Sequence, residues 1–120
     1  MLSDVLREHL LRPRHVGRPA RAHRSARAEN PVCGDVLHLH AARDEHGGLE
    51  LRFEAEQACS AVLSLSSYAL ERWQGYRADE LRRADARALA LEAGGLPPGK
   101  GHAADLLQRA LHALLEELDA

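Results

Sequence analysis

Two short segments with alternating apolar residues most constrain the fold of this 120-residue chain. Residues 36–41 (VLHLHA) and 49–53 (LELRF) repeat with a period of two, which is typical of half-buried β-strands. Residues 44–48 (DEHGG) supply turn residues between them, so the pattern predicts an antiparallel hairpin. The start of the first strand and the end of the second then share one end of the hairpin. We therefore expect Cys33 and Cys59 to be neighbours in space.

The other regular segments show helical spacing of apolar residues. Aromatic residues make up only 3% of the chain, and its apolar content is mostly Ala and Leu, which favours helix. We expect Ser3 to cap a first helix that Pro13 terminates, and Gly75 to stop a second one. The helices are predicted at residues 3–12, 60–74, 77–92 and 103–118. Residues 12–30 are rich in arginine, glycine and proline and indicate an irregular linker.

Length and charge define the broad class. One domain covering residues 1–120 is expected from the length, and 45% apolar residues are enough to build its core. Sixteen basic and 18 acidic side chains give a net charge of -2, which favours neither nucleic acid nor an anionic membrane as a partner. No apolar run approaches the roughly 20 residues of a membrane span, and the charged opening does not resemble a signal peptide. We expect a cytoplasmic protein.

The two cysteines are the main candidates for chemistry. A cytosolic setting favours metal ligands or reactive thiols over a disulfide, with two buried thiols as the plain alternative. Asp35 lies two residues after Cys33, and His102 lies between a Pro/Gly loop and a helix. Together with Cys59 they make four candidate ligands for one tetrahedral metal ion. Asp35 as a turn residue and His102 as an ordinary first helical residue remain alternatives.

A second pair of candidate ligands is less convincing. His38 and His40 share one face of the predicted strand, and such an HxH pair can chelate a metal ion. No third ligand lies near them in the sequence, so we favour an exposed sheet face. The remaining histidines fit surface or capping positions, except that His9 suits a structural role.

Four motifs in order resemble the iron–sulfur cluster assembly scaffolds of the IscU type, which include the N-terminal domain of NifU and the SufU proteins. Residues 8–17 (EHLLRPRHVG) resemble the family's D-H-[FY]-x-x-P-R-N-V-G, and residues 30–35 (NPVCGD) resemble its N-P-x-C-G-D. Residues 59–67 resemble the helix that begins at the second cysteine. Residues 96–102 (LPPGKGH) resemble the L-P-P-V-K-I-H loop, which ends in a ligand histidine.

This resemblance implies an α+β fold of the SufE/IscU type, with a small antiparallel sheet of about three strands and helices packed on one face. The third strand is expected between Arg18 and Asn30, against the coil indicated by the residues themselves. It further implies a non-enzymatic scaffold that holds a transient [2Fe–2S] cluster or Zn²⁺. The implied ligands are Cys33, Asp35, Cys59 and His102.

The same resemblance implies protein partners. These are a cysteine desulfurase that supplies sulfur, acceptor apoproteins that receive the cluster, and an Hsp70-type chaperone. In the family the chaperone reads the loop, here represented by Leu96, Pro97, Pro98 and Lys100.

The chain departs from the family at several positions. The third cysteine, which accepts sulfur in the family, is replaced by Ala103, and the chain holds no other thiol to take its place. Gly99 replaces the valine of the chaperone loop, and Leu2 stands near the place of an N-terminal tyrosine. An alternative function is therefore a zinc-binding paralogue that regulates a desulfurase or adapts it to other proteins without building clusters. A thiol enzyme using Cys59 as nucleophile is a third, weaker hypothesis.

Overall fold

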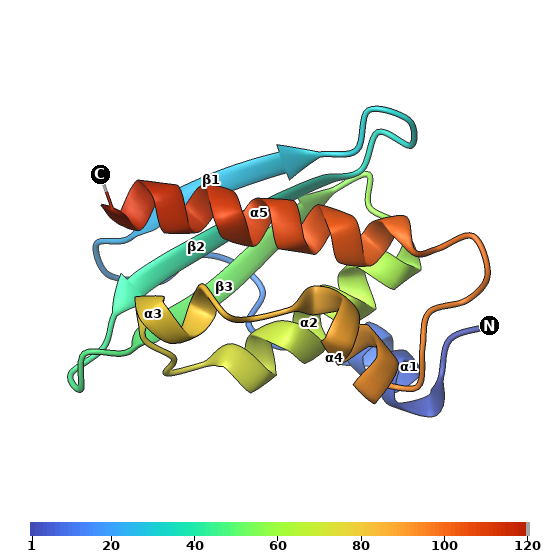
Figure 1. Ribbon diagram of the computed structural model, residues 1–120, viewed down its shortest axis with the longest axis horizontal. Helices are drawn as coiled ribbons and strands as arrows, with labels where there is room; N and C mark the ends of the chain where they lie inside the picture. Colours follow the sequence, from blue (N-terminus) through green and yellow to red (C-terminus); the bar gives the residue numbers. More distant parts are fainter. Residues whose placement is uncertain (120) are drawn as a thin grey trace.

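The predicted hairpin forms the centre of a three-stranded antiparallel sheet (Figure 1). In the computed structural model, which describes residues 1–119, β2 (Val36–Arg43) pairs with β3 (Leu49–Glu56), and Leu39 lies opposite Phe53. β1 (Arg24–Glu29) pairs with the other side of β2, so the strand order is β1-β2-β3. The α+β prediction is confirmed.

β1 shows that the prediction of an irregular linker over residues 12–30 is wrong for its second half. The segment RSARAE contains no aromatic or β-branched residue, so its own preference for a strand is low. Its ladder with β2 and its position beside α5 (His102–Asp119) supply what the local sequence lacks, because Ala26 and Ala28 pack against the core. The third strand implied by the family resemblance is present.

The helices cover one face of the sheet. α5 runs along β1 and β2, while α2 (Ser60–Trp73) lies against β3 and α5 (Figure 1). α1 (Asp4–Leu11) packs on α2 and is capped by Ser3, whose side chain accepts a hydrogen bond from the Leu6 amide. Fully buried side chains fill the space between helices and sheet: Leu37, Leu51, Phe53, Leu65, Leu70, Leu106, Leu107, Leu111 and Leu114.

The predicted single helix over residues 77–92 is instead two short helices. α3 (Ala78–Leu81) is separated from α4 (Ala86–Glu92) by a turn. Asp85 has an extended backbone, and its carboxylate accepts hydrogen bonds from the amides of Arg87 and Ala88, so it caps α4 as a new helix. Asp85 interrupts the apolar repeat that predicted one helix, and aspartate is a residue type that favours the start of a new helix.

The free edge of β3 is closed by the chain itself. Leu51 donates its amide to Gln74 Oε1 and accepts a hydrogen bond from Gln74 Nε2, at 2.9 and 2.6 Å. On one side of this clamp, the backbone of Gly75 and Tyr76 pairs with Leu49. On the other side, His15 and Gly17 pair with Phe53. An edge paired in this way cannot recruit another strand.

The outer face of the sheet was predicted to be exposed, but part of it is covered. His38 remains partly exposed and bonds to Glu56, but His40 is only 2% exposed. The segment before β1 crosses this face, and the His23 ring packs edge-on against the His40 ring. Among the described residues, no helix is long and apolar enough to span a lipid bilayer.

Candidate metal centre

Three separate parts of the chain converge at one end of the sheet. They are the turn between β1 and β2, the start of α2 and the start of α5 (Figure 1). The hairpin sets this arrangement, because it returns the chain to the end at which the β1–β2 turn lies. Each part carries at least one of the four residues that the sequence predicted as ligands.

The turn from Asn30 to Asp35 presents two of them in different environments. Gly34 donates its amide to the Asn30 carbonyl at 2.7 Å, and the Asn30 amide donates to the Asp35 carbonyl at 2.8 Å. Gly34 adopts a φ of +79°, which a residue with a side chain enters only with strain. The tight turn leaves Cys33 exposed at its tip and buries Asp35, which is 3% exposed.

The two helix starts supply the other pair. Cys59 is the N-cap residue of α2, and its side chain makes no capping hydrogen bond. Its Sγ lies 3.7 Å from Nε2 of His102, the first residue of α5. The Pro/Gly loop positions this histidine, since the amide of Ala103 donates to the carbonyl of Lys100 at 3.1 Å.

The donor atoms lie close enough to share one ion. One ligand atom each from Cys33, Asp35 and His102 lies within 4.8 Å of the others. Asp35 Oδ2 is 3.4 Å from His102 Nε2, and Cys59 lies beside the same nitrogen. A tetrahedral zinc site with its usual bond lengths places neighbouring donors about 3.3–3.8 Å apart. Cys59 is not part of this group of three, so it would complete a four-donor site only after its side chain moves.

Asp35 gives an independent indication of a cation. Its Oδ2 is buried and has no hydrogen-bond partner among the described residues, because the contact to His102 lacks hydrogen-bonding geometry. A buried carboxylate oxygen without a donor is costly, so such atoms are rare and usually serve a ligand or a proton. The donor set of two thiols, one carboxylate and one imidazole suits zinc or an iron–sulfur cluster.

Other sequence candidates lie elsewhere. His38 and His40 are on the outer face of the sheet, bonded to Glu56 and Glu54, and do not reach this end. His9 is buried and bonds to Ser67, in agreement with the structural role predicted for it. Ala103, at the third-cysteine position, is buried in the core rather than open to solvent.

A cavity of about 510 Å³, which was not predicted from the sequence, adjoins the site. His102, Leu96 and the exposed Leu91 contribute to its lining, together with Arg87 and Ala104. It lies beside the loop containing Leu96, Pro97, Pro98 and Lys100, of which Pro98 and Lys100 are exposed. Leu91 on α4 is 77% exposed, which only the folded structure shows.

A three-stranded sheet covered by helices, with cysteine, aspartate and histidine side chains gathered at its end, defines a class of small α+β proteins with a candidate metal site at one end of the sheet. The chain belongs to the family described as NifU-like N terminal domain, which matches residues 1–119. The sequence resemblance to this family is therefore confirmed.

Curated relatives of this chain are iron–sulfur cluster assembly scaffold proteins. Two iron–sulfur cluster assembly scaffold proteins of Archaeoglobus fulgidus, IscU 1 and IscU 2, are each 33% identical over 115 residues, covering 92% of this chain and 74% of the relative. The iron–sulfur cluster assembly scaffold protein IscU of Aquifex aeolicus is 30% identical over 117 residues, covering 96% of this chain and 74% of the relative.

Solved structures share the fold. A NifU-like protein (N-terminal) from Brucella abortus superposes with a TM-score of 0.68 at 20% identity, covering 97% of this chain and 90% of its own. A putative SUF-system scaffold from Fervidobacterium islandicum AW-1 gives a TM-score of 0.69 at 17% identity, covering 94% and 95%. At these identities the likeness concerns the fold alone.

Proposed function

We propose that this protein is a scaffold that binds iron and a labile [2Fe–2S] cluster and passes the cluster to acceptor proteins. The proposal is carried by the buried Oδ2 of Asp35, which lies near two thiols and an imidazole and has no hydrogen-bond partner among the described residues. Kinship with iron–sulfur scaffold proteins over nearly the whole chain supports it. The protein itself performs no substrate turnover in this proposal.

The four proposed ligands together hold both irons of the cluster. Cys33, Asp35, Cys59 and His102 provide two donors for each iron of the cluster. Carboxylate and imidazole donors in place of thiolates reduce the negative charge of the site, so the cluster is held more weakly than by four cysteines. Exposure of Cys33 at the tip of its turn leaves the cluster accessible to an acceptor.

Asp35 keeps the cluster releasable. Carboxylate oxygen is a poor ligand for an iron–sulfur cluster, so this donor is the first to detach. Asp35→Ala should slow the loss of a reconstituted cluster to a chelator, measured by the decay of its visible absorption. A variant that loses its cluster faster than the unaltered protein would refute this role.

The proposed partners follow from the same site. A cysteine desulfurase donates sulfur, and acceptor apoproteins receive the cluster at the exposed end of the sheet. An Hsp70-type chaperone would contact the loop formed by Leu96, Pro97, Pro98 and Lys100. Gly99 in this loop has a φ of +80° and adds no apolar side chain, so we expect chaperone binding weaker than to a loop with valine there.

The decisive experiment measures iron, zinc and acid-labile sulfide on anaerobically purified protein. It is done before and after incubation with a cysteine desulfurase, cysteine, ferrous iron and a thiol reductant. Iron and sulfide should appear together, and Cys33→Ser should lose both. His46→Ala changes an exposed histidine away from the site and serves as the matched control. If the unaltered protein gains no more iron and sulfide than Cys33→Ser does, the scaffold proposal is contradicted.

Ala103 favours a second candidate function. Without a third thiol the chain lacks the residue that accepts sulfur in the family, and the remaining four donors suffice for one zinc ion. In this alternative the protein holds zinc and regulates a desulfurase or adapts it to other proteins. Zinc alone, unchanged by the incubation, together with a change in desulfurase turnover, would support it.

A further inference from the structure

A second group of reactive side chains lies on the outer face of the sheet and shares no residue with the metal centre. Ser25 of β1 is opposite His40 of β2 in the strand register, and their Oγ and Nδ1 atoms are 2.7 Å apart. On the other side of the ring, His40 Nε2 lies 2.8 Å from Glu54 Oε1 of β3. A serine, a histidine and a glutamate thus form a continuous hydrogen-bonded chain across three strands.

The protons in this chain can be assigned from its members. Arg18 donates to Glu54 Oε1 at 2.8 Å, and this bond together with that of His40 lowers the pKa of Glu54, which stays ionised. An ionised carboxylate only accepts, so His40 donates from Nε2. Nδ1 is then the unprotonated nitrogen and accepts the hydroxyl proton of Ser25. Burial lowers the pKa of His40, which keeps the ring neutral near pH 7.

The three residues therefore occupy the roles of nucleophile, general base and orienting acid. Ser25 is exposed, as a nucleophile must be, whereas His40 is buried and fixed on both sides. Arg27 lies two residues further on the same face of β1, where its guanidinium pairs with Glu29 at 3.2 Å. A hollow of about 310 Å³, lined in part by Arg18, His38 and Glu54, adjoins these residues and has room for a small reagent.

We propose that Ser25 is an activated nucleophile that takes an acyl group from small activated carboxylic esters. Ser25 Oγ forms a bond to the carbonyl carbon while its proton moves to Nδ1 of His40. The carbon–oxygen bond to the leaving alcohol then breaks, and that alcohol departs with the proton from His40. An acyl-serine remains, and no oxidant or reductant is consumed. Glu54 acts through the histidine and is a positioning residue.

Diisopropyl fluorophosphate provides a direct probe, because it reacts with activated serines in the same way and spares thiols. Ser25 Oγ bonds to phosphorus, fluoride leaves, and the proton passes through His40 to solvent. We expect one label per chain, located on Ser25 by peptide mass spectrometry. Ser25→Ala should abolish the label, and His40→Gln should slow labelling at least about tenfold. Ser60→Ala removes another exposed serine and should change nothing.

The pH profile distinguishes activation from simple exposure. His40 is faced by Ser25 from β1, by Glu54 and the opposite Arg52 from β3, and by His23 from the preceding segment, with Arg18 behind the glutamate. Labelling should rise as His40 loses its proton, and Glu54→Gln should shift that profile while far-UV circular dichroism stays unchanged. This variant also replaces His40→Gln as the test if the latter fails to fold.

Three results would overturn the proposal. They are no label on Ser25, labelling of Ser25 and Ser60 at equal rates, or the same rate in the folded protein and in protein unfolded by urea. None of these results bears on the proposed cluster binding, which involves different side chains at one end of the sheet.

Discussion

Two buried serines of α2 have opposite hydrogen-bonding states. Ser67 Oγ accepts from the amide of Arg14 at 2.8 Å and lies 2.7 Å from Nδ1 of His9, so it joins α1 and the following loop to α2. Ser66 Oγ is equally buried and has no partner among the described residues. A buried hydroxyl without a partner loses its bonds to water and gains nothing in return.

Ser66→Ala should therefore stabilise the protein, by about 1 kcal/mol. Alanine removes the unpaired hydroxyl and also has the higher helix propensity. The measurement is the urea midpoint at an unchanged denaturant dependence. Ser67→Ala is the matched control and should lower the midpoint, because it leaves the Arg14 amide and His9 Nδ1 without their shared partner. A lower midpoint for Ser66→Ala would contradict the prediction.

Buried histidines make stability depend on pH. Burial is the main cause that lowers the pKa of His9, with the nearby Arg14 charge adding to it, and burial likewise lowers the pKa of His40. The unfolded chain keeps the ordinary histidine pKa of about 6.5 and so binds protons more readily than the folded protein. As the pH falls through and below this value, the free energy of unfolding should decrease.

Thermal unfolding at pH 7 and pH 5 tests this prediction. The melting temperature should be lower at pH 5, and the difference should shrink in His9→Gln, which removes one of the titrating groups. His46→Gln, at an exposed position, should leave the difference as it is. Equal melting temperatures at the two pH values would show that these histidines do not limit stability.

At the scale of the elements, the edge of β3 depends on one side chain. Gln74 makes both hydrogen bonds of the clamp on the Leu51 backbone. Gln74→Ala should cost about 1–2 kcal/mol, because it removes two hydrogen bonds and uncovers the backbone of β3. The Leu51 amide should then exchange its hydrogen faster in deuterium oxide. Gln74→Glu is a matched variant that still accepts from the amide but cannot donate to the carbonyl, so it should restore only part of the protection. Unchanged exchange in Gln74→Ala would contradict the clamp.

Elements with strong local signals could be predicted, and the others depend on distant partners. Alternation identified β2 and β3, and Ser3 and Gly75 marked the ends of their helices. β1 could not be derived from its own residues, because arginine, serine and alanine do not favour a strand until β2 and α5 are in place. Local sequence likewise could not indicate the burial of His40, because the ring that packs on it belongs to His23, 17 positions earlier in the sequence.

The candidate site was predicted from topology and from the family resemblance. The hairpin predicts from topology alone that Cys33 lies near Cys59, whereas His102 entered through its place after a Pro/Gly loop and through the resemblance. Local sequence could not indicate that Asp35 is buried with no hydrogen bond to its Oδ2 among the described residues, because its burial depends on the packing of the turn against the two helix starts.

At the scale of the whole molecule, one metal ion would tie together three distant parts of the chain. The proposed donors belong to the β1–β2 turn, α2 and α5, so they come together only in the folded state. Zinc at 100 times its dissociation constant should add about 2.7 kcal/mol to the free energy of unfolding. Cys33→Ser should lose most of this gain, as measured by thermal unfolding with and without zinc. An equal gain in Cys33→Ser would place the metal elsewhere.

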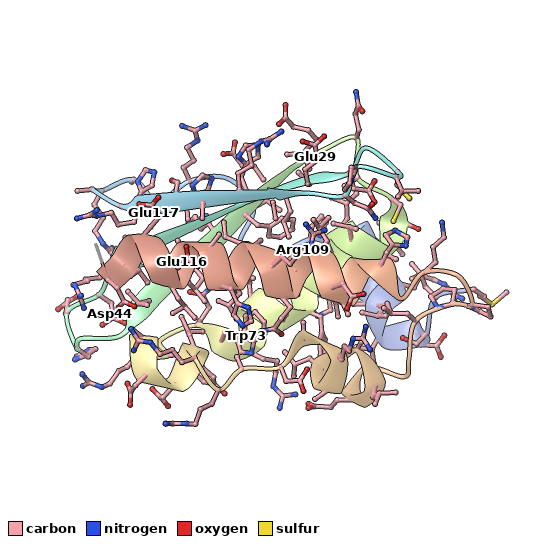
Figure 2. All side chains as sticks on the ribbon, turned by 45° about the horizontal axis from the view of Figure 1, so that its top comes forward. Glu29, Asp44, Trp73, Arg109, Glu116 and Glu117 are labelled. Carbon is pink, nitrogen blue, oxygen red and sulfur yellow. The ribbon has the colours of Figure 1, made fainter. Side chains whose placement is uncertain are left out.

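Trp73 is the only tryptophan of the chain and lies beneath α5 in the core, 2% exposed (Figure 2). It is the last residue of α2, whose other end begins beside Cys59, so the length of the 14-residue helix separates them, roughly 20 Å. Its emission wavelength therefore reports the integrity of the core without direct contact with the ligands. Fluorescence can follow unfolding in the same cuvette in which visible absorption follows the cluster, which allows loss of cargo and loss of structure to be timed separately.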